Sequence, residues 1–130
     1  MAMSYVILEP RQLVCSRATG ALTDEDLFEF MGRLRADPQF RSDFCHLADF
    51  RSVTALEITA AGVRRVSEIA PFGPGSRRAL VAESEAIFGM ARMYELVSER
   101  GGSVVRVFRH MDAALEWLEL PGDFQAPDRE

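Results

Sequence analysis

Residues 77–97 constrain the fold of this chain more than any other stretch. Residues 79–82 are a short apolar run between two arginines and Glu83-Ser84, which is typical of a strand buried on both faces. After Ser84 the period changes, and apolar residues recur at helical spacing: Ile87, Met90, Ala91, Tyr94 and Val97. A buried strand that leads directly into an amphipathic helix is half of a β-α-β unit. The sequence therefore predicts an α/β fold.

Strand and helix patterns alternate along the rest of the chain. Residues 5–8 and 13–18 predict an opening hairpin, whose second strand ends at Gly20. Thr23 is expected to cap a helix with an acidic first turn, which stops at Asp37-Pro38. Further strands are predicted at 44–50 and 103–108, and further helices at about 58–70, from Ser84 to Gly101-Gly102, and at 112–118.

The predicted order is therefore β-β-α-β-α-β-α-β-α. It implies a mostly parallel five-stranded sheet with the antiparallel N-terminal hairpin at its edge. Residues 77–83 should form an interior strand, flanked by the strands at 44–50 and 103–108. A length of 130 residues indicates one domain, 1–130, with an ordered core of about 4–119 and a tail at 120–130.

Composition narrows the classes of function. The net charge of −5 argues against a nucleic-acid partner, and the doublets Arg64-Arg65 and Arg77-Arg78 are interpreted as capping or solvated element ends. No apolar run approaches the ~20 residues of a membrane span, and no secretory signal follows Met1. Cys15 and Cys45 are expected to be buried, reduced thiols, so the predicted location is the cytoplasm.

Ligands of such sheets bind beyond the carboxyl ends of the parallel strands, where strand-to-helix junctions meet. Those junctions supply most of the candidate residues for binding a ligand or partner. Thr59 at the predicted second helix and Phe88 and Met93 on the predicted third helix complete the set. The candidates are Asp49, Ser52, Thr54, Thr59, Glu83, Ser84, Phe88, Met93 and Arg109.

No arrangement of catalytic or metal-binding groups emerges from these segments. Cys45 and His46 are neighbours in a strand and should point to opposite faces, so they cannot act on one substrate. His46 and His110 lack the paired spacing of metal ligands. The glycines at 73–75 precede a strand instead of opening a helix, as a phosphate loop would. The sequence predicts no catalytic residue, no metal and no cofactor, and hence a protein that is not an enzyme.

The helix after Ser84 offers a possible surface for a partner. Met90 and Tyr94 fit the core, whereas Phe88 and Met93 lie off the main apolar stripe. Apolar side chains left on a surface usually have partners. Phe88 and Met93, with the loop at Phe72, are therefore candidates for a two-fold interface, and a homodimer is one expectation.

Three segments, together with the order of elements, carry a resemblance to a known family. They are LADFRSV at 47–53, FGMARMYE at 88–95, and VFR at 107–109 followed by ALEWL at 114–118. The chain resembles a SpoIIAA-like protein of the STAS superfamily over roughly 5–118, in particular the small uncharacterised bacterial group. The resemblance implies a SpoIIAA/STAS-like fold and a non-enzymatic regulatory module with a protein partner.

The same group is described as related to CRAL-TRIO lipid-binding domains. This relation implies the alternative function, a binder of a small apolar or lipid-like ligand in a pocket between sheet and helices. CRAL-TRIO domains are considerably larger, and this chain has little length left to enclose a chamber of several hundred Å³.

The resemblance also raises the question of a phosphorylation switch. In the anti-sigma-factor antagonists of the superfamily, a partner kinase phosphorylates a serine that opens the helix after the third strand. The matching segment is 57–62, and alignment on Gly62 places Ala60 at that serine and Thr59 at the preceding aspartate. Only Ser52, Thr54 or Thr59 could then accept a phosphate, Thr59 being best placed. We therefore expect that phosphorylation does not switch this protein and that a partner binds the unmodified strand-end surface.

Overall fold

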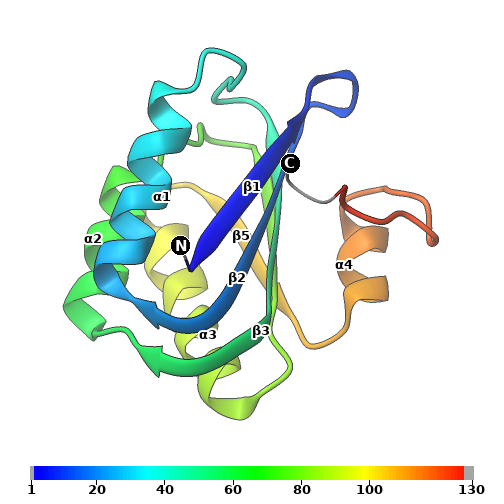
Figure 1. Cartoon of the computed structure of the whole chain (residues 1–130). Helices are drawn as coiled ribbons and strands as arrows, with labels where there is room; N and C mark the ends of the chain where they lie inside the picture. The colour runs from blue at the N-terminus through cyan, green and yellow to red at the C-terminus, as the bar shows by residue number, and fades with distance from the viewer. Residues whose placement is uncertain (1, 128–130) are drawn as a thin grey trace.

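The computed structural model describes residues 2–127 and contains one mixed sheet with helices on both faces (Figure 1). The sheet order is β1-β2-β3-β4-β5, in which β1 and β2 are antiparallel and every other pair is parallel. The predicted fold class, element order and interior position of β4 are confirmed. The elements are β1 (Met3–Leu8), a 3₁₀ turn (Glu9–Arg11), β2 (Leu13–Thr23), α1 (Asp24–Ala36), β3 (Cys45–Glu57), α2 (Ala60–Ile69), β4 (Arg77–Val81), α3 (Glu85–Arg100), β5 (Val104–Phe108) and α4 (Met111–Trp117).

The start of α1 follows the local chemistry that the sequence indicates. The Asp26 backbone N–H donates to Thr23 Oγ1 at 3.2 Å, and the Thr23 backbone N–H donates to Asp26 Oδ2 at 2.9 Å. This reciprocal capping box satisfies two backbone donors that the helix leaves free. The helix ends at Ala36, with Asp37 in extended geometry before Pro38.

Strands β2 and β3 are longer than predicted. β2 continues to Thr23, and β3 continues to Glu57, because the two segments pair in parallel beyond the reach of β4. The register shifts between Gly20 and Ala21, and Gly20 has a φ of 69°, so this glycine accommodates an irregularity within the strand instead of ending it. The polar run at 51–54 was interpreted as a junction, and the structure corrects it to strand.

The two faces of the sheet are covered differently. Helices α1, α2 and α3 cover one face, and α4 covers the other (Figure 1). Side chains alternate between these faces, so that His46, Ala48 and Leu80 pack under the three helices and Leu47, Ala79 and Val81 pack under α4.

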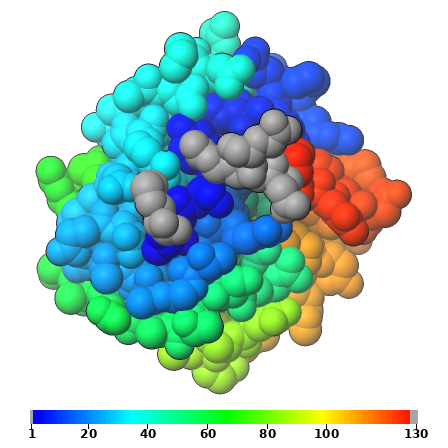
Figure 2. Space-filling model, in the orientation of Figure 1, coloured from blue at the N-terminus to red at the C-terminus, as the bar shows by residue number. Residues whose placement is uncertain are grey.

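The segment after α4 packs where the sequence indicates a tail. Leu120, Phe124 and Ala126 contact the α4-side core, and the Arg11 guanidinium lies 5.2 Å from the centroid of the Phe124 ring. In Figure 2 this segment (red) lies between the hairpin loop (blue) and α4 (orange). Residues 128–130 lie outside the described part of the chain.

Candidate functional site

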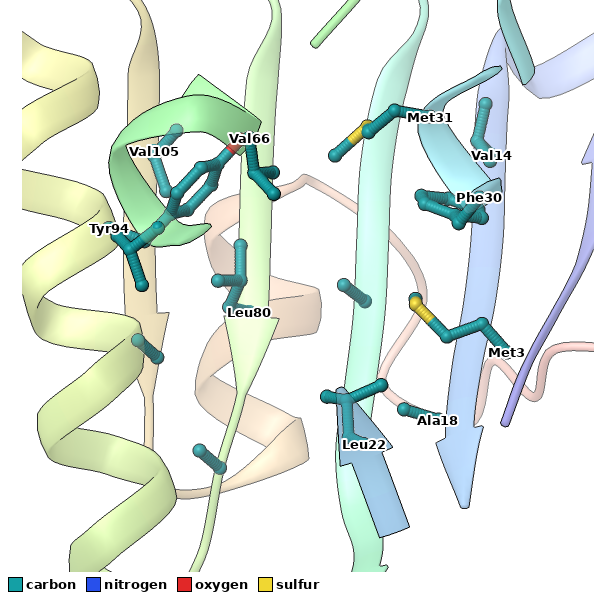
Figure 3. Packing of buried hydrophobic residues seen from close by; sticks show 14 of the residues in the cluster. Met3, Val14, Ala18, Leu22, Phe30, Met31, Val66, Leu80, Tyr94 and Val105 are labelled. Atoms are coloured by element: carbon teal, nitrogen blue, oxygen red, sulfur yellow. The ribbon is translucent and has the colours of Figure 1, made fainter. Parts of the chain in front are cut away.

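An apolar pocket lies between the sheet and helices α1, α2 and α3. Its cavity volume is about 70 Å³, and it is not fully enclosed. Figure 3 shows Phe30 and Met31 on one side of this region, with Tyr94 and Val66 on the other, above Leu80 of β4. Among the described residues, the lining comprises Met3, Leu22, Leu27, Phe30, Met31, His46, Ala48, Phe50, Leu56, Ile58, Val63, Val66, Arg78, Leu80, Ile87, Met90, Ala91 and Tyr94.

The pocket has an apolar mouth and a polar floor. The half-buried residues of the lining, which we take as the mouth, come from α1, β3, the segment before α2, and α3: Leu27, Phe50, Leu56, Ile58 and Met90. His46 and Arg78 lie opposite each other at the beginnings of β3 and β4, and both are buried. A molecule that enters at the carboxyl ends of the strands therefore meets apolar walls first and these polar groups last.

Arg78 is a buried cation without an anionic partner. Its side chain is 2% exposed, and within residues 2–127 no carboxylate forms an ion pair with it. Nη2 donates a hydrogen bond to the Tyr94 hydroxyl, and the guanidinium lies 4.5 Å from the Phe72 ring centroid and 5.3 Å from that of Tyr94. Nε is buried and has no hydrogen-bond partner. Arginine stays charged at any ordinary pH, so the charge itself is enclosed in the fold.

His46 is buried beside this cation as a neutral imidazole. Its ring stacks between Phe72 and Phe30, with centroid separations of 5.0 Å and 5.7 Å. Burial, and then the positive charge of Arg78, lower the pKa of His46 well below 6.5. Nε2 shares a hydrogen bond of 2.7 Å with the Ser16 hydroxyl, whereas Nδ1 is buried without a partner.

The predicted site residues lie elsewhere, and none of them lines the pocket. Asp49 accepts hydrogen bonds from Arg51 at 2.9–3.0 Å and borders an open groove on the α4 face. Burial of the Asp49 carboxyl acts to raise its pKa. The hydrogen bonds and charge of Arg51 outweigh burial and lower the pKa of Asp49 below its usual value. Ser52 and Thr54 are exposed on the extension of β3. The structure thus places three of the candidates on one strand without assembling a site.

Thr59 caps α2 and is held by α1. Its hydroxyl donates to Asp24 Oδ2 at 2.6 Å, its backbone N–H donates to Asp24 Oδ1 at 3.0 Å, and Thr59 Oγ1 accepts from the Gly62 N–H at 2.9 Å. A Cβ at Gly62 would collide with the Asp24 carboxylate, so this chain's own side chain occupies the space beside the glycine.

The remaining candidates surround the start of α3. Ser84 is its N-cap and accepts from the Ile87 N–H at 3.3 Å, while Glu83 before it is exposed. The Arg109 guanidinium lies 3.9 Å from the Phe88 ring centroid and pairs with Glu85. Arg109 thereby covers Phe88.

The other predicted partner residue, Met93, is half-buried against the core of the three-helix face. Neither Phe88 nor Met93 is thus a fully exposed apolar side chain.

Sequence reasoning missed Arg78, His46, Tyr94 and Ser16 as members of one site. The interpretation of the Arg77-Arg78 doublet holds for the exposed Arg77 and is wrong for Arg78. The sequence does contain a signal for the burial of Arg78. Adjacent strand residues point to opposite faces, so in a strand that is buried on both faces one arginine of a doublet must face a core.

Other features of the described residues bear on chemistry. Cys45 and His46 do pack on opposite faces, as predicted. Burial raises the pKa of Cys15 to about 12, against the effect of Arg11, so this thiol stays protonated. Between residues 2 and 127, no cluster of three or more His, Cys, Asp or Glu side chains is placed to hold a metal ion. No helix in that range is long and apolar enough to cross a membrane.

Comparisons with known proteins bear on the fold. No protein-family model matches the sequence, and no curated protein matches it. Among solved structures, the chain is similar to an uncharacterised protein of the DUF3478 family with a SpoIIAA-like fold from Shewanella loihica PV-4. The TM-score is 0.61 at 18% sequence identity, over 90% of this chain and 94% of the other. Together with the sheet order and the helices on its two faces, this similarity shows that the chain has a SpoIIAA-like fold.

Proposed function

We propose that this protein is a non-enzymatic SpoIIAA-like module that binds a small apolar ligand in the pocket between the sheet and helices α1–α3. One observation carries the proposal: two residues that line the deep end of an apolar pocket, Arg78 and His46, each have a buried polar atom without a hydrogen-bond partner. Buried polar groups in folded proteins almost always have a hydrogen-bond partner. A ligand in the pocket, next to Arg78 and His46, would supply partners for such atoms.

The size of the pocket limits the ligand. A volume of about 70 Å³ corresponds to roughly two waters of liquid volume, whereas sites for drug-sized ligands measure roughly 300–1,000 Å³. The pocket therefore suits a small molecule whose far end lies against the half-buried mouth residues. A whole membrane lipid does not fit this volume.

Regulation through a protein partner remains the broader role that we propose for such a module. The contact between Thr59 and Asp24 supports a mechanism without phosphorylation. A phosphate on Thr59 would face the carboxylate that now accepts its hydroxyl proton, and this like-charge contact is unfavourable. Mass spectrometry of protein from its native cells should find Thr59 unmodified, and stoichiometric phosphate there would contradict this part of the proposal.

Ligand binding can be tested directly with a neutral probe. Protein-observed NMR during a titration with hexan-1-ol should shift resonances of the pocket residues Ala48 and Ala91, and leave Trp117 on the opposite face unchanged. Ala91→Leu should fill the cavity and abolish these shifts. Ala86→Leu, on an exposed position of the same helix, is the matched control and should bind like the parent. Shifts that are spread over the surface or unaffected by Ala91→Leu would contradict the proposal.

A further inference from the structure

We infer that the ligand of this pocket is a monocarboxylic acid with an apolar tail, bound with its carboxylate on Arg78 and its tail toward the mouth. This inference rests on the proposed function and specifies the chemical class of the ligand. The structural basis is the juxtaposition of a buried, anion-free guanidinium with apolar walls in one pocket.

The first argument is charge. The cost of burying an ion is recovered only when an opposite charge and further hydrogen bonds accompany it. The contacts of Arg78 within the described chain are two aromatic rings and one hydroxyl, and none of them carries a negative charge. An anion bound in the pocket, next to Arg78, would supply the missing charge.

The second argument is the excess of donors at the floor. Arg78 Nε–H has no acceptor. Tyr94 accepts from Arg78, and its own O–H has no acceptor among residues 2–127. If Ser16 donates to His46 Nε2, the ring proton lies on Nδ1, which adds a third unsatisfied donor. A carboxylate only accepts hydrogen bonds, so it complements this set, whereas an alcohol or amine would bring donors that find no acceptor.

The third argument concerns the composition of the ligand, which should carry a single negative charge and an apolar tail. The floor holds one cation, and every other lining side chain apart from His46 and Tyr94 is apolar. A phosphate dianion would bring more charge than Arg78 neutralises, and a sugar or nucleotide would bury hydroxyl groups against Leu, Ile, Met and Phe side chains. A carboxylate followed by methylene groups matches both ends of the pocket. Its first carbons fill the cavity, and the remaining ones lie against Leu27, Leu56 and Met90.

The test compares three probes of equal chain length by the same NMR titration: sodium hexanoate, hexan-1-ol and hexylammonium chloride. Hexanoate should bind about tenfold or more tightly than hexan-1-ol, since a hydrogen bond to a charged group contributes that much. Hexylammonium should bind most weakly, because its charge would meet Arg78. Arg78→Met should remove the preference for hexanoate over hexan-1-ol.

Two further variants make the outcome decisive. Arg77→Met, next to Arg78 but exposed, should bind hexanoate like the parent. Tyr94→Phe removes the hydroxyl donor but also the acceptor of Arg78 Nη2, and it keeps the charge, so this variant should still bind hexanoate more tightly than hexan-1-ol. Equal affinity for hexanoate and hexan-1-ol would overturn this inference and leave the proposed function intact. No binding of either probe would overturn both.

Discussion

Arg78→Met should stabilise the ligand-free protein, although it replaces one of the most deeply buried side chains in the fold. Arg78 is 2% exposed, and methionine offers an unbranched side chain of similar volume that can pack against Phe72 and Leu80. The substitution removes a buried charge and leaves an apolar side chain. Replacing buried ionic groups by well-packed apolar residues is often neutral or stabilising.

The magnitude follows from the contacts of the guanidinium. The effective penalty for burying one ion is several kcal/mol. Two cation–π contacts, each worth up to about 2 kcal/mol when desolvated, and one charged hydrogen bond of about 1.5–3 kcal/mol offset most of it. The unsatisfied Nε–H remains and costs about 1–3 kcal/mol. We therefore expect Arg78→Met to raise the free energy of unfolding by about 1–3 kcal/mol.

Urea unfolding followed by circular dichroism measures this change. Arg78→Met combined with Tyr94→Phe should show at least the same gain, because the double variant leaves no tyrosine hydroxyl without its partner. Arg77→Met is the control, since its ion pair with Glu119 is exposed and its effect should stay within about 0.5 kcal/mol. If both Arg78 variants lose more than about 2 kcal/mol, the guanidinium is a structural requirement, and the reasoning that assigns it to a ligand fails.

Three further predictions test the rest of the structure. The pKa of His46 is lowered in the folded state, so the unfolded chain binds the proton more readily below pH 6.5. The contribution of neutral His46 to the stability of the fold is therefore fully present above that pH and is lost as the pH falls below it. The free energy of unfolding should fall from pH 7 to pH 5, and His46→Gln should abolish most of this fall. Val81→Asp places an unpaired carboxylate at a position that is 0% exposed on the α4 face, and it should prevent soluble expression; a well-folded variant would contradict the interior position of β4. Gly62→Ala should lower the free energy of unfolding by about 1–3 kcal/mol, because the added methyl group displaces Asp24 from Thr59. Gly89→Ala, where the added methyl group meets open space, should raise the free energy of unfolding by about 0.5–1 kcal/mol. A gain in both variants would show that Asp24 moves freely.

The fold could be predicted from the sequence because its determinants are local. The capping box at Thr23 and the change from strand to helix period around Ser84 each depend on a few consecutive residues. Helices and strands that alternate in this way leave few possible topologies. The lengths of β2 and β3 could not be predicted, because residues 51–57 are polar enough to form a loop and become a strand only when β2 offers its edge.

The candidate site could not be predicted for a related reason. The sequence interpretation placed ligands in the loops at the carboxyl ends of the strands, where Asp49 and Glu83 lie. The pocket instead extends beneath the helices to His46 and Arg78, near the other ends of the strands. Its floor exists only when β3 and β4 pair in one register and α3 brings Tyr94 across them. The contact between these residues of β3, β4 and α3 cannot be predicted from the spacing of residues within any one segment.

The two faces of the sheet show why the polar floor is better explained by a ligand than by folding. On the α4 face the buried core is apolar, from Leu13 and Leu47 to Val81 and Leu115. That face shows that this sheet can be covered with apolar packing alone. The face under α1–α3 has three helices to cover it and still buries Ser16, His46 and Arg78. We expect an apolar side chain at position 78 to pack at lower cost, and we therefore attribute the arginine to the proposed recognition of an anionic group.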